Sequence, residues 1–154
     1  MTILSAQSIR KIQPVTPFHE RTVFEGMTFG LGPAGYDIRI KESISILPAD
    51  GLILASSIEE FWIPKDILGV VHDKSSWCRL GLTVQNTVLE PGWRGFLTLE
   101  LTNHLKNGAK PINIRAGSPI AQVVFHQLDA ITDQPYKGKY QNQPEGPQPA
   151  ILET

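Results

Sequence analysis

The stretch Phe96-Leu97-Thr98-Leu99-Glu100-Leu101 alternates leucine with other residues, and this alternation decides the fold class. A period of two residues is typical of a β-strand with one face against a core. The three leucines share one face of that strand, and Glu100 shares the opposite face with Thr98. The pattern alone does not say which face points inward.

Six further runs of β-branched or alternating residues lie on both sides of this stretch, and glycine or proline separates them. The runs are Tyr36–Ile40, Ser43–Ile46, Leu52–Ala55, Gly69–His72, Ile112–Ile114 and Ala121–Phe125. The turn signals are Gly30–Pro33, Pro48–Gly51, Pro91–Gly92, Asn107–Gly108 and Ala116–Gly117. Many short strands with regular turns predict an all-β domain, either a sandwich or a jelly-roll-like barrel.

Two short helical segments are expected beside the strands. Leu4–Ile12 has helical spacing of apolar residues, with Ser5 as its cap, and Pro14 lies just beyond it. Ser75–Leu80 predicts one brief helical turn.

Length and charge exclude several classes of protein. The 154 residues suit one domain spanning 1–154, and 14 basic against 15 acidic side chains give a net charge of −1. We therefore expect no nucleic-acid or membrane partner. One cysteine excludes an internal disulfide, and we expect a cytoplasmic protein because no secretory or membrane-spanning segment is evident.

Residues 134–154 differ in composition from the rest of the chain, since they are rich in proline, glycine and glutamine. Such a segment cannot build a core, so one interpretation is a disordered terminus. Tyr136, Lys139 and Gln143 support the other interpretation, a flexible arm that folds over a phosphorylated ligand.

Candidate reactive groups gather between residues 74 and 100. Ser75 and Ser76 can donate to phosphate oxygens, and Arg79 can pair with a phosphate. The alternative for these three is a capped surface turn. An inward-facing Glu100 would have a raised pKa, which suits a general acid or base, whereas a solvent-facing Glu100 fits the alternation equally well.

Several other chemistries lack their minimal motifs. Cys78 stands alone, so the His/Cys-x-Glu and Pro-Cys-x-x-Cys pattern of zinc deaminases is absent and no zinc is expected. The four histidines have no ligand spacing. Neither a P-loop nor a G-x-S-x-G elbow occurs.

Taken in order, the motifs resemble those of the trimeric dCTP deaminases, which are relatives of the dUTPases. The resemblance covers most of the chain. It rests on Ala34–Arg39, Ile63–Gly69, Ser75–Leu82, Pro91-Gly92-Trp93 with Gly95, Leu99–Glu100, and Pro135–Gln143.

This resemblance implies a distorted jelly-roll fold and a homotrimer with active sites at the subunit interfaces. It implies a deoxynucleoside triphosphate substrate accompanied by Mg²⁺. Glu100 matches the general acid/base, Ser75 and Arg79 match the residues that position the water, and Ser76 matches a phosphate contact. Tyr136, Lys139 and Gln143 match the arm that closes over the triphosphate.

Three positions depart from the pattern that the resemblance supplies. Glu90 stands where Asp is usual for the sugar 3′-hydroxyl, and Lys74 stands where Arg is usual. Thr83–Leu89, which includes the candidate base contact Gln85, is shorter than the base-gripping segment of the family.

The leading hypothesis is zinc-independent deamination of dCTP to dUTP and ammonia. A dUTPase or bifunctional enzyme that releases pyrophosphate is the first alternative. A non-catalytic nucleotide-binding trimer is the second, and only the shortened segment supports it. Glu100 favours deamination, because simple dUTPases resemble this sequence but carry an apolar residue there.

Overall fold

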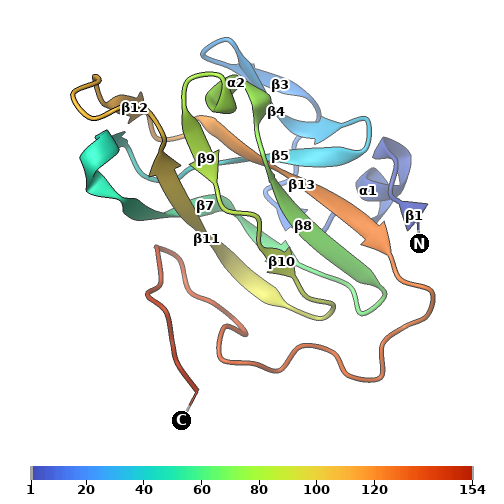
Figure 1. Cartoon of the computed structure of the whole chain (residues 1–154). Coiled ribbons are helices and arrows are strands. Elements are labelled where there is room, and N and C mark those ends of the chain that lie inside the picture. Colours follow the sequence, from blue (N-terminus) through green and yellow to red (C-terminus); the bar gives the residue numbers. More distant parts are fainter. Residues whose placement is uncertain (1, 154) are drawn as a thin grey trace.

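Two antiparallel sheets and a small two-stranded sheet form the fold in the computed structural model, which describes residues 2–153 (Figure 1). The larger sheet runs β10 (Val88–Leu89), β8 (Ile67–Asp73), β13 (Pro119–Gln127), β5 (Gly35–Arg39), β4 (Met27–Gly32) and β3 (Thr22–Phe24), and β1 (Thr2–Ile3) pairs with β13. The second sheet runs β2 (Val15–Thr16), β7 (Leu52–Trp62), β11 (Arg94–Asn103) and β9 (Leu82–Val84). A third pair joins β12 (Ile112–Ile114) to β6 (Ile44–Ile46). The predicted all-β class is confirmed.

The core lies between the two larger sheets and takes alternate side chains from each. Leu99 and Leu101 of β11 are fully buried, as is Phe125 of β13. The opposite face of β11, which carries Thr98 and Glu100, is only half-buried. In β11 the leucines therefore point into the core, and Glu100 lies on the outer face.

The helical segments are shorter than expected. The N-terminal helix α1 (Ala6–Ile12) begins at Ala6 and not at Leu4, because the Leu4 amide donates to Phe125 O and continues the β1 pairing. Ser5 occupies the N-cap position without a side-chain cap bond. The second helix, α2 (Ser75–Cys78), ends two residues before Leu80.

The turn predicted over Pro48–Gly51 contains a short 3-10 helix, η1 (Pro48–Asp50). The turn predicted over Gly30–Pro33 is wrong for its first three residues, since they belong to β4. Gly30 has a φ of +89°, and a Cβ there would lie 2.5 Å from Glu20 O, so the backbone crosses too closely for any side chain.

The strand expected over Leu52–Ala55 extends to Trp62. Its polar continuation includes Ser56 and Glu59, which are fully buried and bonded within the fold. Glu59 receives bonds from the Arg39 side chain at 2.7 Å and from the Arg39 amide at 2.9 Å. Glu42 accepts from the Ser56 hydroxyl at 2.6 Å. These partners allow a polar sequence to form an internal strand.

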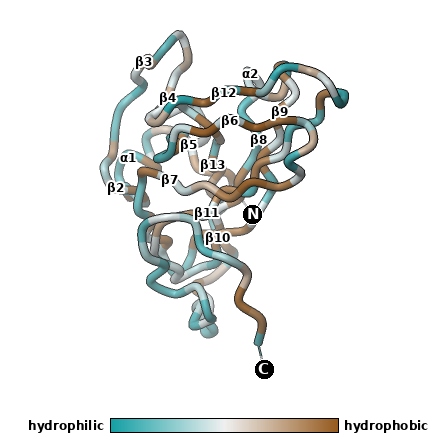
Figure 2. Tube along the Cα trace, turned by 90° about the vertical axis from the view of Figure 1, so that its left-hand side faces the viewer, coloured by the Kyte–Doolittle hydropathy of each residue, from teal (hydrophilic) through white to brown (hydrophobic). Residues whose placement is uncertain are grey.

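The described part of the segment after β13 forms no regular strand, and Gln143 makes an isolated bridge to Gly95 of β11. The segment passes beneath the lower ends of β10 and β11 and then turns back along the second sheet (Figure 1). Figure 2 shows that this segment is mainly hydrophilic and that a short hydrophobic piece precedes its end. We call residues 134–153 the arm.

Candidate active site

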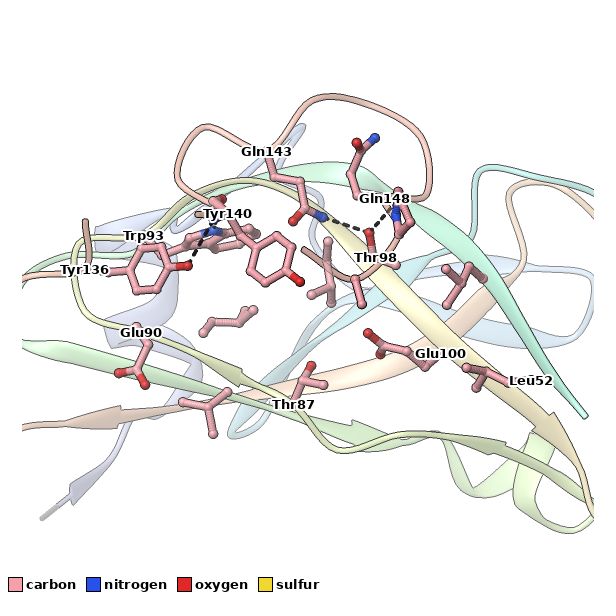
Figure 3. A pocket seen from close by; sticks show the side chains of 16 residues that line it. Leu52, Thr87, Glu90, Trp93, Thr98, Glu100, Tyr136, Tyr140, Gln143 and Gln148 are labelled. Atoms are coloured by element: carbon pink, nitrogen blue, oxygen red, sulfur yellow. Dashed lines mark hydrogen bonds between the residues drawn. The ribbon is translucent and has the colours of Figure 1, made fainter. Parts of the chain in front are cut away.

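A cavity of about 440 Å³ opens between the outer face of β11, the β10 segment and the arm (Figure 3). Its lining combines an apolar wall with a few polar groups, which is the usual composition of a small-molecule site. The lining residues are Leu52, Leu54, Thr87, Val88, Leu89, Glu90, Trp93, Leu97, Thr98, Glu100, Tyr136, Tyr140, Gln143, Gln148, Pro149 and Ala150.

Glu100 projects from the middle of β11 into this cavity (Figure 3). Burial raises the pKa of its carboxyl above the usual value, and a backbone hydrogen bond partly offsets that rise. The Gln85 main-chain N–H donates to Glu100 O at 2.9 Å, so the Thr83–Leu89 segment is tied directly to the Glu100 backbone. A carboxyl with a raised pKa holds its proton to higher pH than a free glutamate, which suits a group that both takes up and releases a proton.

Glu90 lies at another edge of the cavity, at the end of β10, and also borders a smaller hollow beside Tyr136. The turn that follows it is fixed by backbone bonds from Trp93 N to Glu90 O at 3.0 Å and from Gly92 N to Ile63 O at 3.0 Å. The carboxylate can accept a hydrogen bond from a hydroxyl of a bound ligand.

The arm closes one side of the cavity through its tyrosines and glutamines. Tyr136 N donates to Pro91 O at 2.8 Å, and Trp93 Nε1 donates to Tyr140 O at 2.7 Å. Gln143 is buried, and its amide group contacts the Thr98 hydroxyl at 2.8 Å. The arm therefore forms one wall of the cavity and is held there by hydrogen bonds.

The residues around α2 form a separate group near the upper end of β8 (Figure 1). Lys74 Nζ lies 2.5 Å from Asp37 Oδ2, and both side chains are nearly buried. Gln122 donates to the other oxygen of Asp37 at 3.1 Å. The buried Trp77 anchors α2 to β13, because its indole N–H donates to Pro119 O at 2.6 Å. These bonds therefore hold α2 in place, together with Ser75, Ser76 and Arg79.

One chain brings only part of the expected site together. Of the ten residues expected from the sequence, Glu90, Glu100, Tyr136 and Gln143 line the cavity. Within residues 2–153, the cavity lining does not include Lys74, Ser75, Ser76, Arg79, Gln85 or Lys139. Lys139 instead stacks 5.5 Å above the ring of Tyr140.

Sequence reasoning missed several cavity residues. Thr98 had a usable signal, since alternation places it beside Glu100 on one face of the strand. Tyr140 and Gln148 lie in an arm whose path no local pattern could reveal. Trp93 was noted as part of a motif, but its bond to the arm depends on a contact 47 residues away.

Between residues 2 and 153, no group of three or more His, Cys, Asp or Glu side chains is placed to hold a metal ion. The described helices include none that is long and apolar enough to cross a membrane.

Comparison with known proteins identifies the family. A sequence model described as dCTP deaminase-like matches residues 37–128. The dCTP deaminase of Helicobacter acinonychis (strain Sheeba) is 35% identical over 163 residues, which cover 84% of this chain and 85% of that protein. The chain belongs to the dCTP deaminase-like family. Because 163 aligned positions exceed the 154 residues of this chain, that relative carries segments that this chain lacks.

Solved structures show the same fold. The dCTP deaminase from Agrobacterium tumefaciens matches with a TM-score of 0.62 and 18% identity, covering 81% of this chain and 48% of that chain. A dUTPase variant from phage phi11 of S. aureus, which coordinates a structural Mg(II) ion, matches with a TM-score of 0.57 and 15% identity, covering 80% and 92%. The predicted jelly-roll fold of the deaminase and dUTPase relatives is confirmed.

Proposed function

We propose that this chain catalyses the hydrolytic deamination of dCTP to dUTP and ammonia, with Glu100 as the general acid/base. The position of Glu100 carries the proposal. Its half-buried carboxyl, with a raised pKa, faces a cavity that the arm closes. The curated relatives named dCTP deaminase support the choice of substrate and reaction.

The reaction replaces the amino group at cytosine C4 with oxygen from water. Ionised Glu100 takes a proton from the water as its oxygen bonds to C4. Glu100 passes that proton to ring N3, then takes the remaining proton from the new C4 hydroxyl and delivers it to the amino nitrogen, so that ammonia leaves as the C4 carbonyl forms. Proton uptake and release within one cycle suit a carboxyl whose pKa lies closer to neutrality than usual.

Glu90 and the arm have binding roles in this proposal. Glu90 accepts a hydrogen bond from the 3′-hydroxyl of the sugar, and Gln85 belongs to the segment beside the base. Tyr136, Lys139 and Gln143 belong to a flexible arm, residues 134–154 of a single domain, that covers the triphosphate. Mg²⁺ enters as part of the substrate and is held by phosphate oxygens. The reaction uses no zinc. The enzyme acts in the cytoplasm.

We also propose that the chain assembles as a homotrimer whose sites lie at subunit interfaces. The observation that supports this is the separation of two groups of functional residues. Glu90, Glu100 and Gln143 line the cavity, whereas Lys74, Ser75, Ser76 and Arg79 cluster at α2 outside its lining. In a closed cyclic assembly, α2 of one subunit can complete the cavity of its neighbour.

A nucleotide panel tests the activity. We expect dCTP with Mg²⁺ to yield equimolar dUTP and ammonia, and we expect no turnover of ribonucleotides. Survival of dCTP would contradict the proposal. Release of pyrophosphate from dUTP would support the second candidate, a dUTPase or bifunctional enzyme. The shared fold with dUTPases and the shortened Thr83–Leu89 segment favour testing it.

Mixing two inactive variants tests the shared site. Glu100→Gln and Arg79→Ala damage different groups, so co-refolded mixed trimers would contain some sites with both residues intact. Partial recovery of dCTP turnover in the mixture supports an interface site. If each variant alone is inactive and the mixture is inactive as well, the proposal of an interface site is contradicted.

A further inference from the structure

The arm follows the first half of β11 instead of lying loosely over the cavity. Gly95 and Gln143 form a parallel β-bridge, and Phe96 N donates to Gln143 O at 3.1 Å. The Gln143 side chain returns a bond from Nε2 to Phe96 O at 2.9 Å. Residue 143 is therefore attached to β11 on both its main chain and its side chain.

Gln143 and a later residue of the arm, Gln148, meet at one polar side chain of β11, that of Thr98. Thr98 Oγ1 accepts from Gln143 Nε2 at 2.8 Å and from Gln148 N at 3.0 Å, as Figure 3 shows. A hydroxyl oxygen has two lone pairs, so these two bonds use its full acceptor capacity. A valine has the same shape but cannot accept either bond.

Thr98 stands two residues before Glu100 on the same face of β11, and both line the cavity. The stretch of arm between the two bonds, residues 143–148, is thus fixed beside the carboxyl. Within this stretch Glu145 also pairs with Lys41 on the surface, and Gln148 Nε2 donates to Gly146 O at 3.0 Å. Beyond it, Ile151 N donates to Tyr140 Oη at 2.9 Å.

We propose that Thr98 is a positioning residue that anchors the arm at the cavity by accepting from Gln143 and Gln148. Its role is in nucleotide retention and not in the proton transfers of Glu100. This part of the inference rests on the proposed function, since it assumes that the arm covers a bound nucleotide.

Three variants test the anchor. Thr98→Val removes the acceptor, Thr98→Ser keeps it, and Thr102→Val makes the same change two residues beyond Glu100 on the same face of β11, away from the cavity lining. For each, amide hydrogen exchange of residues 143–151 is measured in the nucleotide-free full chain, and KM and kcat are measured with dCTP.

We expect Thr98→Val to speed arm exchange and to raise KM by about tenfold, the size expected for losing ordinary hydrogen bonds, while kcat changes less. Thr98→Ser should restore slow exchange, and Thr102→Val should exchange like the wild type. Wild-type exchange in Thr98→Val would overturn the proposal, as would equal effects of the two valine variants. If wild-type protein fails to turn over dCTP, the proposed function fails, and the exchange comparison alone still decides the anchor.

Discussion

Glu100 of β11 lies directly opposite Leu54 of β7 in the antiparallel register, and both side chains line the cavity. Cross-strand partners have their Cβ atoms about 5 Å apart, so an apolar side chain sits against the carboxyl. This neighbour helps to remove water from Glu100, and burial is the main cause of its raised pKa.

Glu100→Gln should reduce dCTP deamination by about 10²- to 10⁴-fold, the usual contribution of a general acid/base. Triphosphate binding should persist, because the substitution keeps the size of the side chain. Ammonia release and nucleotide binding by calorimetry measure the two effects. Glu60→Gln serves as the matched control, since Glu60 pairs with Arg94 outside the cavity lining. Retained turnover would remove Glu100 from the mechanism.

The raised pKa of Glu100 also predicts a pH-dependent stability difference. A carboxyl whose pKa is higher in the folded protein favours folding when protonated, and that contribution is lost as the pH rises through the folded-state pKa. Glu100→Gln should therefore unfold at a higher temperature than the wild type at pH 7.

The same difference should shrink as the pH falls through the raised folded-state pKa of Glu100, and it should be lost by about 4.3, the usual pKa of a glutamate in an unfolded chain. Thermal unfolding between pH 4 and pH 8 checks this. A difference that grows toward acid would contradict the assignment of a raised pKa.

Gly95→Ala should release the arm. A Cβ at Gly95 would lie 2.6 Å from Gln143 N, and the φ of +147° disfavours any side chain. We expect faster tryptic cleavage after Lys139, followed by mass spectrometry. Gly108→Ala is the matched control, because Gly108 also has a positive φ, but a Cβ there meets nothing within 4 Å. Equal cleavage of both variants would mean that backbone strain, and not arm contact, explains the effect.

Arg39→Met should destabilise the fold by about 3 kcal/mol, because it leaves the fully buried Glu59 without its charge partner. Urea unfolding measures the loss. The exposed Arg10–Glu20 pair provides the comparison, and Arg10→Met should change stability little. A similar small loss in both variants would show that Glu59 is hydrated or protonated after the substitution.

The sequence allowed the regular strands to be predicted, but not those with unusual surroundings. Ile112–Ile114 was predicted with the observed bounds, because its alternation is local. β7 was predicted too short, since burial of Ser56 and Glu59 depends on partners at Glu42 and Arg39. β4 was not predicted, because Gly30 was interpreted as part of a turn. Its glycine is instead required where two backbone segments cross closely.

The candidate site, too, could be predicted only in part. The structure places Glu90, Glu100, Tyr136 and Gln143 in one cavity, although their catalytic and binding roles stay predictions. The sequence could not show that α2 and Glu100 occupy different parts of one chain, because strand order and not residue spacing determines that separation.

The Thr83–Leu89 segment is held by main-chain hydrogen bonds on both sides of Asn86. Gln85 N donates to Glu100 O at 2.9 Å, and Thr87 O accepts from Val71 N at 3.0 Å. Backbone bonds survive side-chain replacement, so this border of the cavity keeps its width whatever residues occupy it. Redesigning the enzyme for a larger base would therefore require inserted residues between Gln85 and Thr87, because substitutions alone leave the fastening in place.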